Sequence, residues 1–158
     1  MIIVEAENFV KEEGGQAVKT TDRPGTSNNV CISSWDNAGH AIEWQVEIPE
    51  TADYQIVLRY AGGQTWNVYR DLQIDGKIPG DAFKKILLEP TGGFGRNASE
   101  WKNLVVSDGK QPALVNLSKG KHTIRMNNLG GEGANGGANL DLIAFLTKTA
   151  SLDSIQIK

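Results

Sequence analysis

The chain lacks the features that several protein classes require. Its 158 residues include a single cysteine, Cys31, so no internal disulfide can form. The surrounding N-V-C-I-S predicts a buried strand in which the thiol serves as a small apolar side chain. No apolar run approaches the ~20 residues of a membrane-spanning helix. Basic residues form no stripe, and the net charge is −3. We therefore expect neither a membrane nor a nucleic acid as partner.

Catalytic and cofactor motifs are also scarce. The two histidines, His40 and His122, share no zinc-ligand spacing with Cys31, and no G-x-S-x-G or triad pattern occurs. G-E-G-A-N-G at residues 131–136 matches a dinucleotide-binding pattern, which needs a helix after it. The sequence that follows, A-N-L-D-L-I-A-F, is typical of a strand. We therefore interpret residues 131–136 as a glycine-rich loop between two strands.

The sequence contains many strand patterns and no convincing amphipathic helix. In A-I-E-W-Q-V-E-I-P apolar and polar residues alternate and place Trp44 on a buried face, and Y-Q-I-V-L-R-Y follows. Asp75 and Gly76 form a strong hairpin signal. These patterns predict an all-β protein, an antiparallel β-sandwich. We expect one module over residues 1–147. Residues 148–158 then form a linker, which we prefer, or a short edge strand.

Two glutamates stand one residue apart near the start, in V-E-A-E-N-F. On a strand, Glu5, Glu7 and Phe9 would share one face. One interpretation is a pair of solvated carboxylates on an outer face. The other is a calcium site, because Ca²⁺ binds roughly 6–8 oxygen atoms from carboxylates and carbonyls. Asp141 interrupts the apolar strand N-L-D-L-I and needs a partner, so it is the candidate third carboxylate.

Several aromatic residues fall in stretches that are typical of loops. A flat cluster of such rings could stack on sugar rings, with nearby amides and arginines binding the hydroxyl groups. Ordinary packing is the default alternative. The candidates for sugar binding are Trp35, Trp66, Phe94 and Trp101 for stacking, and Asn37, Arg70, Asn135 and Asn139 for hydroxyl groups.

The order of these motifs resembles carbohydrate-binding modules of families 6, 35 and 36, with family 35 favoured. The resemblance runs from V-E-A-E-N-F through A-G-H-A-I-E-W-Q-V-E-I-P-E-T-A-D-Y-Q-I-V-L-R-Y-A and R-D-L-Q-I-D-G-K. It continues through P-T-G-G-F, W-K-N-L-V-V and V-N-L-S-K-G-K-H-T-I-R to A-N-L-D-L-I-A-F. It covers residues 4–147.

The resemblance implies a jelly-roll sandwich with a structural Ca²⁺ ion. The family's metal positions correspond to Glu5, Glu7 and Asp141, with the loop near Asp22 completing the shell. A second Ca²⁺ at the ligand site would involve Asp36.

The resemblance also implies a sugar site in the loops at one end. Trp35 stands at the first stacking position and Phe94 at the second, where the family usually has Trp. If Phe94 does not stack on the sugar, Trp66 or Trp101 would do so instead. Asn135 and Asn139 lie in the last loop.

We therefore expect a non-catalytic, monomeric module of a secreted enzyme that degrades plant cell-wall polysaccharide. Its ligand would be a polysaccharide or oligosaccharide, with mannan- or galactose-containing chains favoured over xylan or uronic acids. One alternative is a small polysaccharide-active enzyme domain that uses two carboxylates among Asp36, Asp71 and Glu132. Another is a protein-binding adhesion sandwich.

Overall fold

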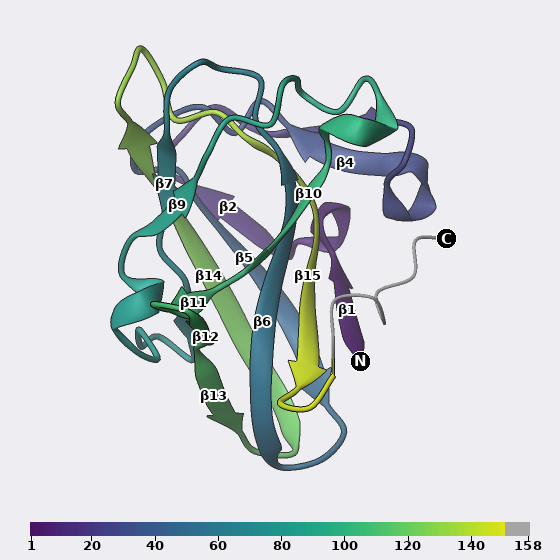
Figure 1. Cartoon of the computed structure of the whole chain (residues 1–158), viewed down its shortest axis with the longest axis vertical. Helices are drawn as coiled ribbons and strands as arrows, with labels where there is room; N and C mark the ends of the chain where they lie inside the picture. Colours follow the sequence, from purple (N-terminus) through teal and green to yellow (C-terminus); the bar gives the residue numbers. More distant parts are fainter. Residues whose placement is uncertain (151–158) are drawn as a thin grey trace.

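The computed structural model describes residues 1–150, which form two antiparallel β-sheets packed face to face (Figure 1). Sheet 1 runs in the order β10 (Lys102–Val105), β6 (Ala52–Ala61), β15 (Asn139–Thr147), β4 (Val30–Ser33) and β3 (Lys19–Asp22); β1 (Ile2–Glu5) also pairs with β15 and β13 (Leu114–Leu117) with β6. Sheet 2 runs in the order β2 (Lys11–Glu13), β5 (Ala41–Ile48), β14 (Gly120–Gly131), β7 (Val68–Arg70) and β9 (Ile86–Leu88), with β8 (Gln73–Ile74) on β14.

Shorter elements complete the described chain. A two-stranded ribbon pairs β11 (Ser107–Asp108) with β12 (Gln111–Pro112), and the helical segments are single 3₁₀ turns: η1 (Ala6–Asn8), η2 (Ser27–Asn29), η3 (Asp81–Phe83) and η4 (Ala98–Glu100). No helix within residues 1–150 is long and apolar enough to cross a bilayer. The predicted antiparallel β-sandwich is confirmed. The predicted linker or edge strand at residues 148–158 lies mostly outside the described residues.

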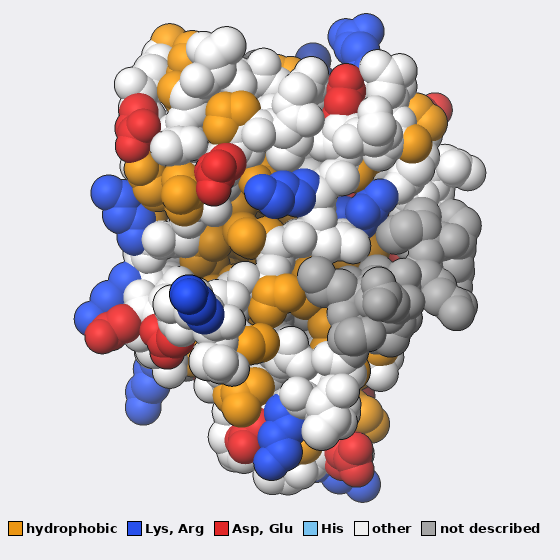
Figure 2. All heavy atoms as spheres, viewed as in Figure 1, with side chains coloured by type: hydrophobic (Ala, Val, Ile, Leu, Met, Phe, Trp, Pro, Cys, Tyr) orange, Lys and Arg blue, Asp and Glu red, His pale blue; other side chains and the backbone are white. Residues whose placement is uncertain are grey.

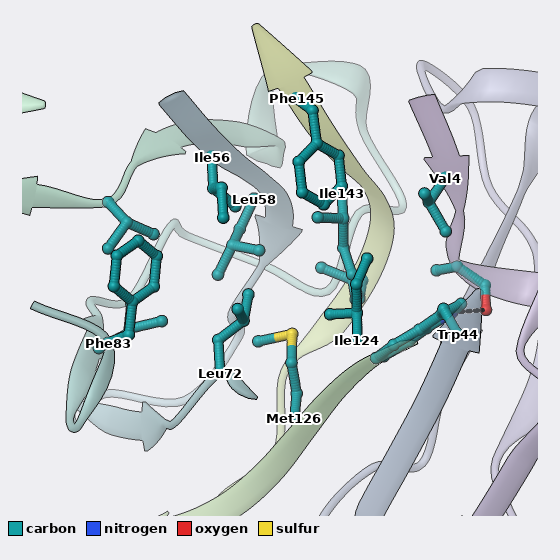
Figure 3. Packing of buried hydrophobic residues seen from close by; sticks show 14 of the residues in the cluster. Val4, Trp44, Ile56, Leu58, Leu72, Phe83, Ile124, Met126, Ile143 and Phe145 are labelled. Atoms are coloured by element: carbon teal, nitrogen blue, oxygen red, sulfur yellow. Dashed lines mark hydrogen bonds between the residues drawn. The ribbon is translucent and has the colours of Figure 1, made fainter. Parts of the chain in front are cut away.

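The core lies between the two sheets and follows the predicted alternation, whereas acidic and basic side chains lie scattered over the face of the molecule that Figure 2 shows. Trp44 on β5 is fully buried, and its indole N–H donates to the Ala6 carbonyl at 2.9 Å. Figure 3 shows side chains from both sheets meeting around Ile124, Met126 and Phe145. Cys31 is likewise buried and unpaired, as predicted.

The Asp75 and Gly76 hairpin is also confirmed. Both residues have positive φ, 52° and 81°, and the Ile74 and Lys77 backbones exchange hydrogen bonds of 2.8 and 3.1 Å across the turn. Two consecutive left-handed residues match the right-handed twist of the flanking strands, and aspartate and glycine tolerate that backbone.

The first strand is shorter than predicted. β1 ends at Glu5, and the backbone turns through η1, so Glu7 lies in a 3₁₀ turn rather than two residues along a strand. The expected common face of Glu5, Glu7 and Phe9 is therefore wrong. The turn places the Ala6 carbonyl where it accepts the hydrogen bond from Trp44.

The last strand lies inside sheet 1 and joins its parts. β15 pairs with β6 on one side and with β1 and β4 on the other, so segments from the beginning and the end of the described chain are neighbours. The register with β6 shifts between Leu140 and Leu142, which leaves Asp141 at an irregularity in the ladder. Such bulges redirect a side chain, and here the redirected group is a carboxylate.

Candidate functional site

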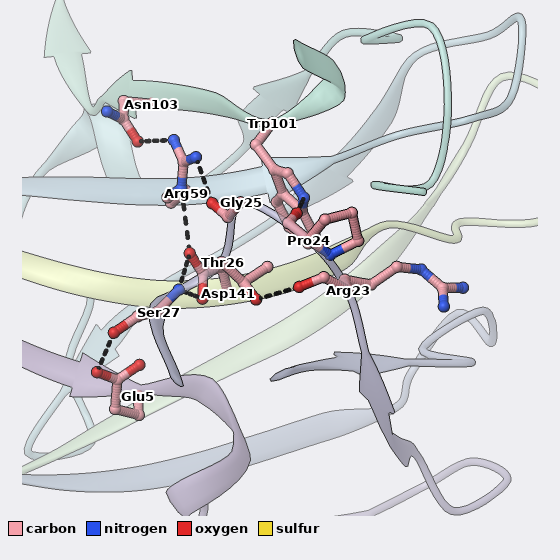
Figure 4. A network of polar contacts seen from close by, with 10 residues as sticks. All are labelled: Glu5, Arg23, Pro24, Gly25, Thr26, Ser27, Arg59, Trp101, Asn103 and Asp141. Atoms are coloured by element: carbon pink, nitrogen blue, oxygen red, sulfur yellow. Dashed lines mark hydrogen bonds and ion pairs between the residues drawn. The ribbon is translucent and has the colours of Figure 1, made fainter. Parts of the chain in front are cut away.

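Asp141 lies at the centre of a buried polar network that connects β15 with η2 and β6 (Figure 4). The Ser27 backbone N–H donates to both carboxylate oxygens, at 3.0 and 3.2 Å. Arg59 forms an ion pair with Asp141 through Nε at 3.1 Å. Its two remaining nitrogens donate to the Gly25 carbonyl at 2.8 Å and to Asn103 Oδ1 at 3.0 Å. Two nitrogens of the guanidinium therefore donate hydrogen bonds, while Nε, among the described residues, faces Asp141 only as an ion pair and makes no hydrogen bond.

The two glutamates join this network incompletely. The Ser27 hydroxyl donates to Glu5 Oε1 at 2.6 Å, but Glu5 Oε2 and Glu7 Oε2 are buried and have no hydrogen-bond partner among residues 1–150. Burial raises the pKa of Glu7, and the nearby charge of Glu5 raises it further. Burial also raises the pKa of Asp141 to about 7, against the opposing effects of Arg59 and Ser27. In the described part of the chain, the three carboxylates thus have one cation paired with them, Arg59.

This carboxylate cluster, Glu5, Glu7 and Asp141, has the donor chemistry of a calcium site. Hard oxygen ligands suit Ca²⁺, and two buried oxygens have no hydrogen-bond donor within the described part of the chain. Within residues 1–150, however, no three acidic, histidine or cysteine side chains already have metal-site geometry. Asp22 does not join the cluster, since it lies exposed at the end of β3.

The loops that follow β4, β6, β9 and β14 gather at one end of the molecule, drawn uppermost in Figure 1. Trp35 stands in the first of them but points inward, with 2 % of its surface exposed. Its indole N–H donates to the His40 carbonyl at 3.0 Å, and the Arg70 guanidinium lies 4.1 Å from the ring centre. A ring covered in this way offers no face to a sugar, so the predicted stacking role of Trp35 is wrong.

Arg70 is also unavailable to a ligand. It is fully buried and donates to the Trp35 carbonyl and the Tyr69 carbonyl, both at 3.1 Å. Burial lowers the pKa of Arg70 to about 9, partly offset by Asp36. The Asn128 side chain supports the same loops, because its Nδ2 donates to the Trp35 and Gly136 carbonyls, both at 3.1 Å. Arg70 and Asn128 therefore stabilise the loops through hydrogen bonds to their backbone carbonyls. The predicted contact of Arg70 with sugar is wrong.

Trp101 and Trp66 differ in exposure. Trp101 is 7 % exposed, packs with Cys31 and Ala61, and donates to the Pro24 carbonyl at 3.2 Å, so it does not provide an exposed platform. Trp66 is half-buried and donates to the Asn135 carbonyl at 2.9 Å. The backbone of Gly133 lies directly against its ring, since a Cβ there would be 2.1 Å from Trp66 Cδ2. One face of Trp66 is thus covered by the glycine-rich loop.

Phe94 is the half-buried aromatic that lines an open hollow. The hollow, of about 260 Å³, is bounded by Arg23, Ser33, Ser34, Asp36, Phe94, Arg96 and Asn139, and we call it the Phe94 hollow. The Phe94 carbonyl accepts from Asn139 Nδ2 at 2.8 Å and from Arg23 Nε at 3.2 Å, which fixes the loop that carries the ring. Phe94 and Asn139, predicted separately, are therefore brought together.

A second hollow adjoins the first through Asp36. It measures about 380 Å³ and lies between the loop after β4 and the glycine-rich loop, with Asn37 and Asn135 on its wall. Asn135 Oδ1 accepts from the Gly137 N–H at 3.0 Å and from Gln64 Nε2 at 3.2 Å. Asp36 is common to both hollows, and no side-chain hydrogen bond occupies its carboxylate among the described residues.

Four residues of the Phe94 hollow were not predicted: Arg23, Ser33, Ser34 and Arg96. Ser34 has a φ of 64°, an uncommon value for a residue with a side chain. Sequence spacing could have indicated Arg96, which follows the loop phenylalanine by two residues, but nothing local connects Arg23 to it.

A serine, a histidine and an aspartate also meet away from the loops. His122 Nδ1 lies 2.6 Å from Asp75 Oδ2, and Nε2 lies 2.7 Å from the Ser118 carbonyl and 3.4 Å from its hydroxyl. Hydrogen bonds to the Ser118 carbonyl and to Asp75 raise the pKa of His122. With both ring nitrogens directed at acceptors, this imidazole is a donor and not a general base for the serine.

Comparison with known proteins gives no match to any protein-family model and none to a curated protein. Solved structures do match. A family 35 carbohydrate-binding module from Clostridium thermocellum is 22 % identical, with a TM-score of 0.66, over 92 % of this chain and 96 % of that one. A module described as Xyl-CBM35, in complex with a disaccharide containing glucuronic acid, is 18 % identical, with a TM-score of 0.67, over 94 % and 95 %. The protein is therefore a β-sandwich with the jelly-roll fold of family 35 carbohydrate-binding modules.

The same fold occurs inside longer proteins. A protein from Listeria monocytogenes, in complex with glucose, magnesium and calcium, is 20 % identical, with a TM-score of 0.66, over 90 % of this chain and 12 % of that one. Other matches lie within larger enzymes, of which the matched region is 12 % or 28 %. The two modules described above are matched over nearly the whole of both chains.

Proposed function

We propose that the chain is a non-catalytic module that binds plant cell-wall polysaccharide and keeps an attached, secreted polysaccharide-degrading enzyme close to its substrate. The observation that carries the proposal is the Phe94 hollow. It combines a half-buried aromatic ring with amide, hydroxyl and charged groups at the loop end of this fold. An aromatic face takes the C–H face of a sugar, and the polar groups take its hydroxyls. A tethered monomer of this kind acts by raising the local concentration of substrate.

The favoured ligands are mannan- or galactose-containing chains. An axial hydroxyl leaves one side of the sugar ring rich in C–H groups, and that side would lie on Phe94. Asn139 and Asp36 stand at the edge of the same hollow, where the hydroxyl groups would point. Asn135 and Trp66 belong to the loops beyond Asp36 and would contact a second sugar residue.

A specific observation favours uronic acids as the second candidate. Arg23 and Arg96 both line the Phe94 hollow, although the protein as a whole is acidic. Guanidinium groups bind carboxylates through charge-assisted hydrogen bonds. Arg23 already donates to the Phe94 and Asp22 carbonyls, so the exposed Arg96 is the freer of the two.

Affinity electrophoresis on galactomannan, galactan, xylan and polygalacturonate tests both candidates. We expect retardation on at least one polymer, strongly reduced by Phe94→Ala and retained by Leu87→Ala, an exposed residue away from the loops. Loss of binding to an acidic polymer alone in Arg96→Gln would assign the uronic acids. Release of new reducing ends by the purified chain would refute the non-catalytic proposal. A protein-binding sandwich would be retarded on none of them.

We also propose that the carboxylate cluster holds a structural Ca²⁺ ion. Glu5 and Glu7 would contribute the oxygens that now lack partners, and Asp141 would contribute the third carboxylate. A bound divalent cation would compensate the negative charge that Arg59 alone cannot balance. A ligand that binds only the folded protein raises its stability, so calcium should raise the melting temperature and a chelator should lower it. Glu7→Gln should reduce this response, and an unchanged melting temperature would count against the site.

Asp36 is the residue that would bind a second Ca²⁺ at the ligand site. Its carboxylate stands between the two hollows and lacks a side-chain donor among residues 1–150. If the ion takes part in recognition, Asp36→Asn should remove the calcium dependence of sugar binding and leave the calcium dependence of the melting temperature intact.

A further inference from the structure

The hollow of about 380 Å³ beside Asp36 is lined by one carboxylate and two side-chain amides, and we call it the Asn135 hollow. Asp36 and Asn37 come from the loop after β4, and Asn135 comes from the loop between β14 and β15, at the end drawn uppermost in Figure 1. The other residues that line it are glycines and alanines. These three side chains therefore supply its side-chain hydrogen-bonding groups.

Backbone groups fix which end of the Asn135 amide is available to the hollow. The Gly137 N–H donates to Asn135 Oδ1 at 3.0 Å, and a backbone N–H can only donate, so this end of the amide must be the oxygen. Gln64 Nε2 donates to the same oxygen at 3.2 Å and also to the Gly137 carbonyl, which can only accept. Both amides are thus oriented by the backbone, and Asn135 Nδ2 is the end that remains for the hollow.

Asn37 is oriented by the same rule, and Asp36 supplies the complement. Asn37 Oδ1 accepts from the Gln16 backbone N–H at 3.0 Å, so Nδ2 is again the end that remains. An ionised carboxylate only accepts. A Cβ on Gly137 would lie 2.5 Å from Asp36 Oδ1 and 3.2 Å from Asn135 Oδ1, so both side chains lie against that glycine. The hollow therefore combines two amide donors with one carboxylate acceptor.

Sugar hydroxyl groups match this set, because one hydroxyl oxygen can accept from an amide and donate to a carboxylate. Two neighbouring hydroxyls on one ring can both donate to Asp36 while they accept from Asn37 and Asn135. A uronic acid residue fits poorly, since its carboxylate would face the like charge of Asp36. The arginines that would compensate it, Arg23 and Arg96, line the Phe94 hollow and not this one.

We propose that the Asn135 hollow selects a neutral sugar residue through two neighbouring hydroxyl groups, and that Gln64 is the positioning residue that keeps Asn135 Nδ2 available to them. The inference rests on the proposed function and extends it, because it assigns neutral and acidic residues of a sugar chain to different hollows. A polymer that carries both would bind in one register, with the acidic residue beside Arg96 and the neutral residue beside Asn135.

NMR of the side-chain amide groups tests the hollow without a polysaccharide. In chelator, so that Asp36 holds no metal, millimolar methyl β-galactoside or methyl α-mannoside should shift the Nδ2 signals of Asn37 and Asn135, whereas galacturonate should shift neither. Equal shifts with galacturonate, or no shift with either neutral glycoside, would overturn the proposal. Affinity electrophoresis measures polymer binding separately, so shifts without retardation on any polymer would refute the proposed function and leave this assignment standing.

Two isosteric variants test the donor and its positioning residue. Asn135→Asp keeps an oxygen for the Gly137 N–H but replaces Nδ2, so affinity for the neutral glycoside should fall about 3- to 10-fold, the value of one hydrogen bond. Gln64→Glu should weaken binding similarly and shift the Asn135 amide signals of the free protein. Gln111→Glu makes the same change on the exposed strand β12 and should do neither. Unchanged affinity in Asn135→Asp, or equal behaviour of the two glutamate variants, would overturn the assigned roles.

Discussion

Asn139 and Asp141 stand two residues apart on β15 and serve two contrasting regions. Asn139 reaches the Phe94 hollow among the loops, whereas Asp141 reaches the carboxylate cluster inside the protein. The cluster is charged and largely buried, with Glu5 and Asp141 on strands and Glu7 in the turn η1, while the hollow is open and bounded mainly by loops. A buried charged side chain needs a compensating partner, which can come from a distant part of the sequence. An exposed side chain in a loop needs no such partner.

Two aromatic residues also differ in burial, although both were expected to be exposed in loops. Trp35 and Phe94 both stand in polar, glycine-flanked loops, yet Trp35 is buried beneath Arg70 and Phe94 lines a hollow. The loops after β4 and β9 are of similar composition. Arg70, on β7, stacks on the first ring and buries it, whereas the backbone of Gly63 lies against the Phe94 ring, where a Cβ would be 2.3 Å from Phe94 Cδ2, and leaves that ring half-buried.

The largest expected effect comes from removing the compensating cation of the cluster. Arg59→Met should cost about 3–5 kcal/mol of unfolding free energy in chelator-treated protein, since a buried carboxylate loses its ion pair. Denaturant titration measures the loss. Asn103→Ala removes one hydrogen bond to Arg59 and keeps the ion pair, so its cost should be near ~1 kcal/mol. Equal losses in the two variants would mean that the ion pair contributes little.

Trp35→Ala should have an effect of similar size on stability and almost none on the intrinsic affinity for sugar. Truncating a buried tryptophan costs about 3–5 kcal/mol, and here it also exposes Arg70, which stacks on the ring. Measured on the folded fraction by titration calorimetry, the affinity should stay within about twofold of the wild type. If a stable Trp35→Ala protein failed to bind sugar, Trp35 would have to be part of the sugar-binding site.

The strands and the buried carboxylate could be predicted from the sequence, whereas the exposure of several candidate site residues could not. Asp141 was identifiable because a charge within an apolar strand needs a partner, and the strands around Trp44 because they alternate. Asp22, Trp35 and Arg70 were misplaced because the exposure of a side chain in a loop or at the end of a short strand depends on distant contacts. The Arg70 and Trp35 stack joins residues 35 positions apart. The 3₁₀ turn at Glu7 was also missed, since the Trp44 hydrogen bond that accompanies it joins residues 38 positions apart.

Phe94→Ala should weaken sugar binding more than it lowers stability, the reverse of what we expect for Trp35→Ala. Losing one stacking face is expected to weaken sugar binding by about tenfold, or ~1.4 kcal/mol, while unfolding free energy falls by less than about 1 kcal/mol because the ring is half-buried. Calorimetry and thermal melting on the same sample measure both quantities. Phe94→Trp, which enlarges the ring, should bind at least as tightly as the wild type. A Phe94→Ala protein that binds normally would place the ligand in the neighbouring hollow beside Asn135.

The smallest effect concerns an ion pair that is partly exposed to water and should therefore contribute less to stability than the buried pair of Arg59 and Asp141. His122 and Asp75 form an ion pair of 2.6 Å, with the Asp75 side chain 53 % exposed. Hydrogen bonds to the Ser118 carbonyl and to Asp75 raise the pKa of His122 above its ordinary 6.5. Burial alone would raise the pKa of Asp75, but hydrogen bonds from the Thr123 N–H and from His122 lower it below 3.8.

The sign of the pH dependence follows from these two shifts. A raised histidine pKa stabilises the fold fully below pH 6.5, and that contribution is lost as the pH rises through the folded value. The lowered pKa of Asp75 stabilises the fold above pH 3.8, and that contribution is lost on further acidification. Wild type should therefore exceed His122→Gln in melting temperature by about 1–3 °C near pH ~5.5, and by less near pH ~8.5. A gap that widens with pH would show that the neutral imidazole is the stabilising form. A gap as large as that of Arg59→Met would show that exposure does not set the strength of a charge pair in this fold.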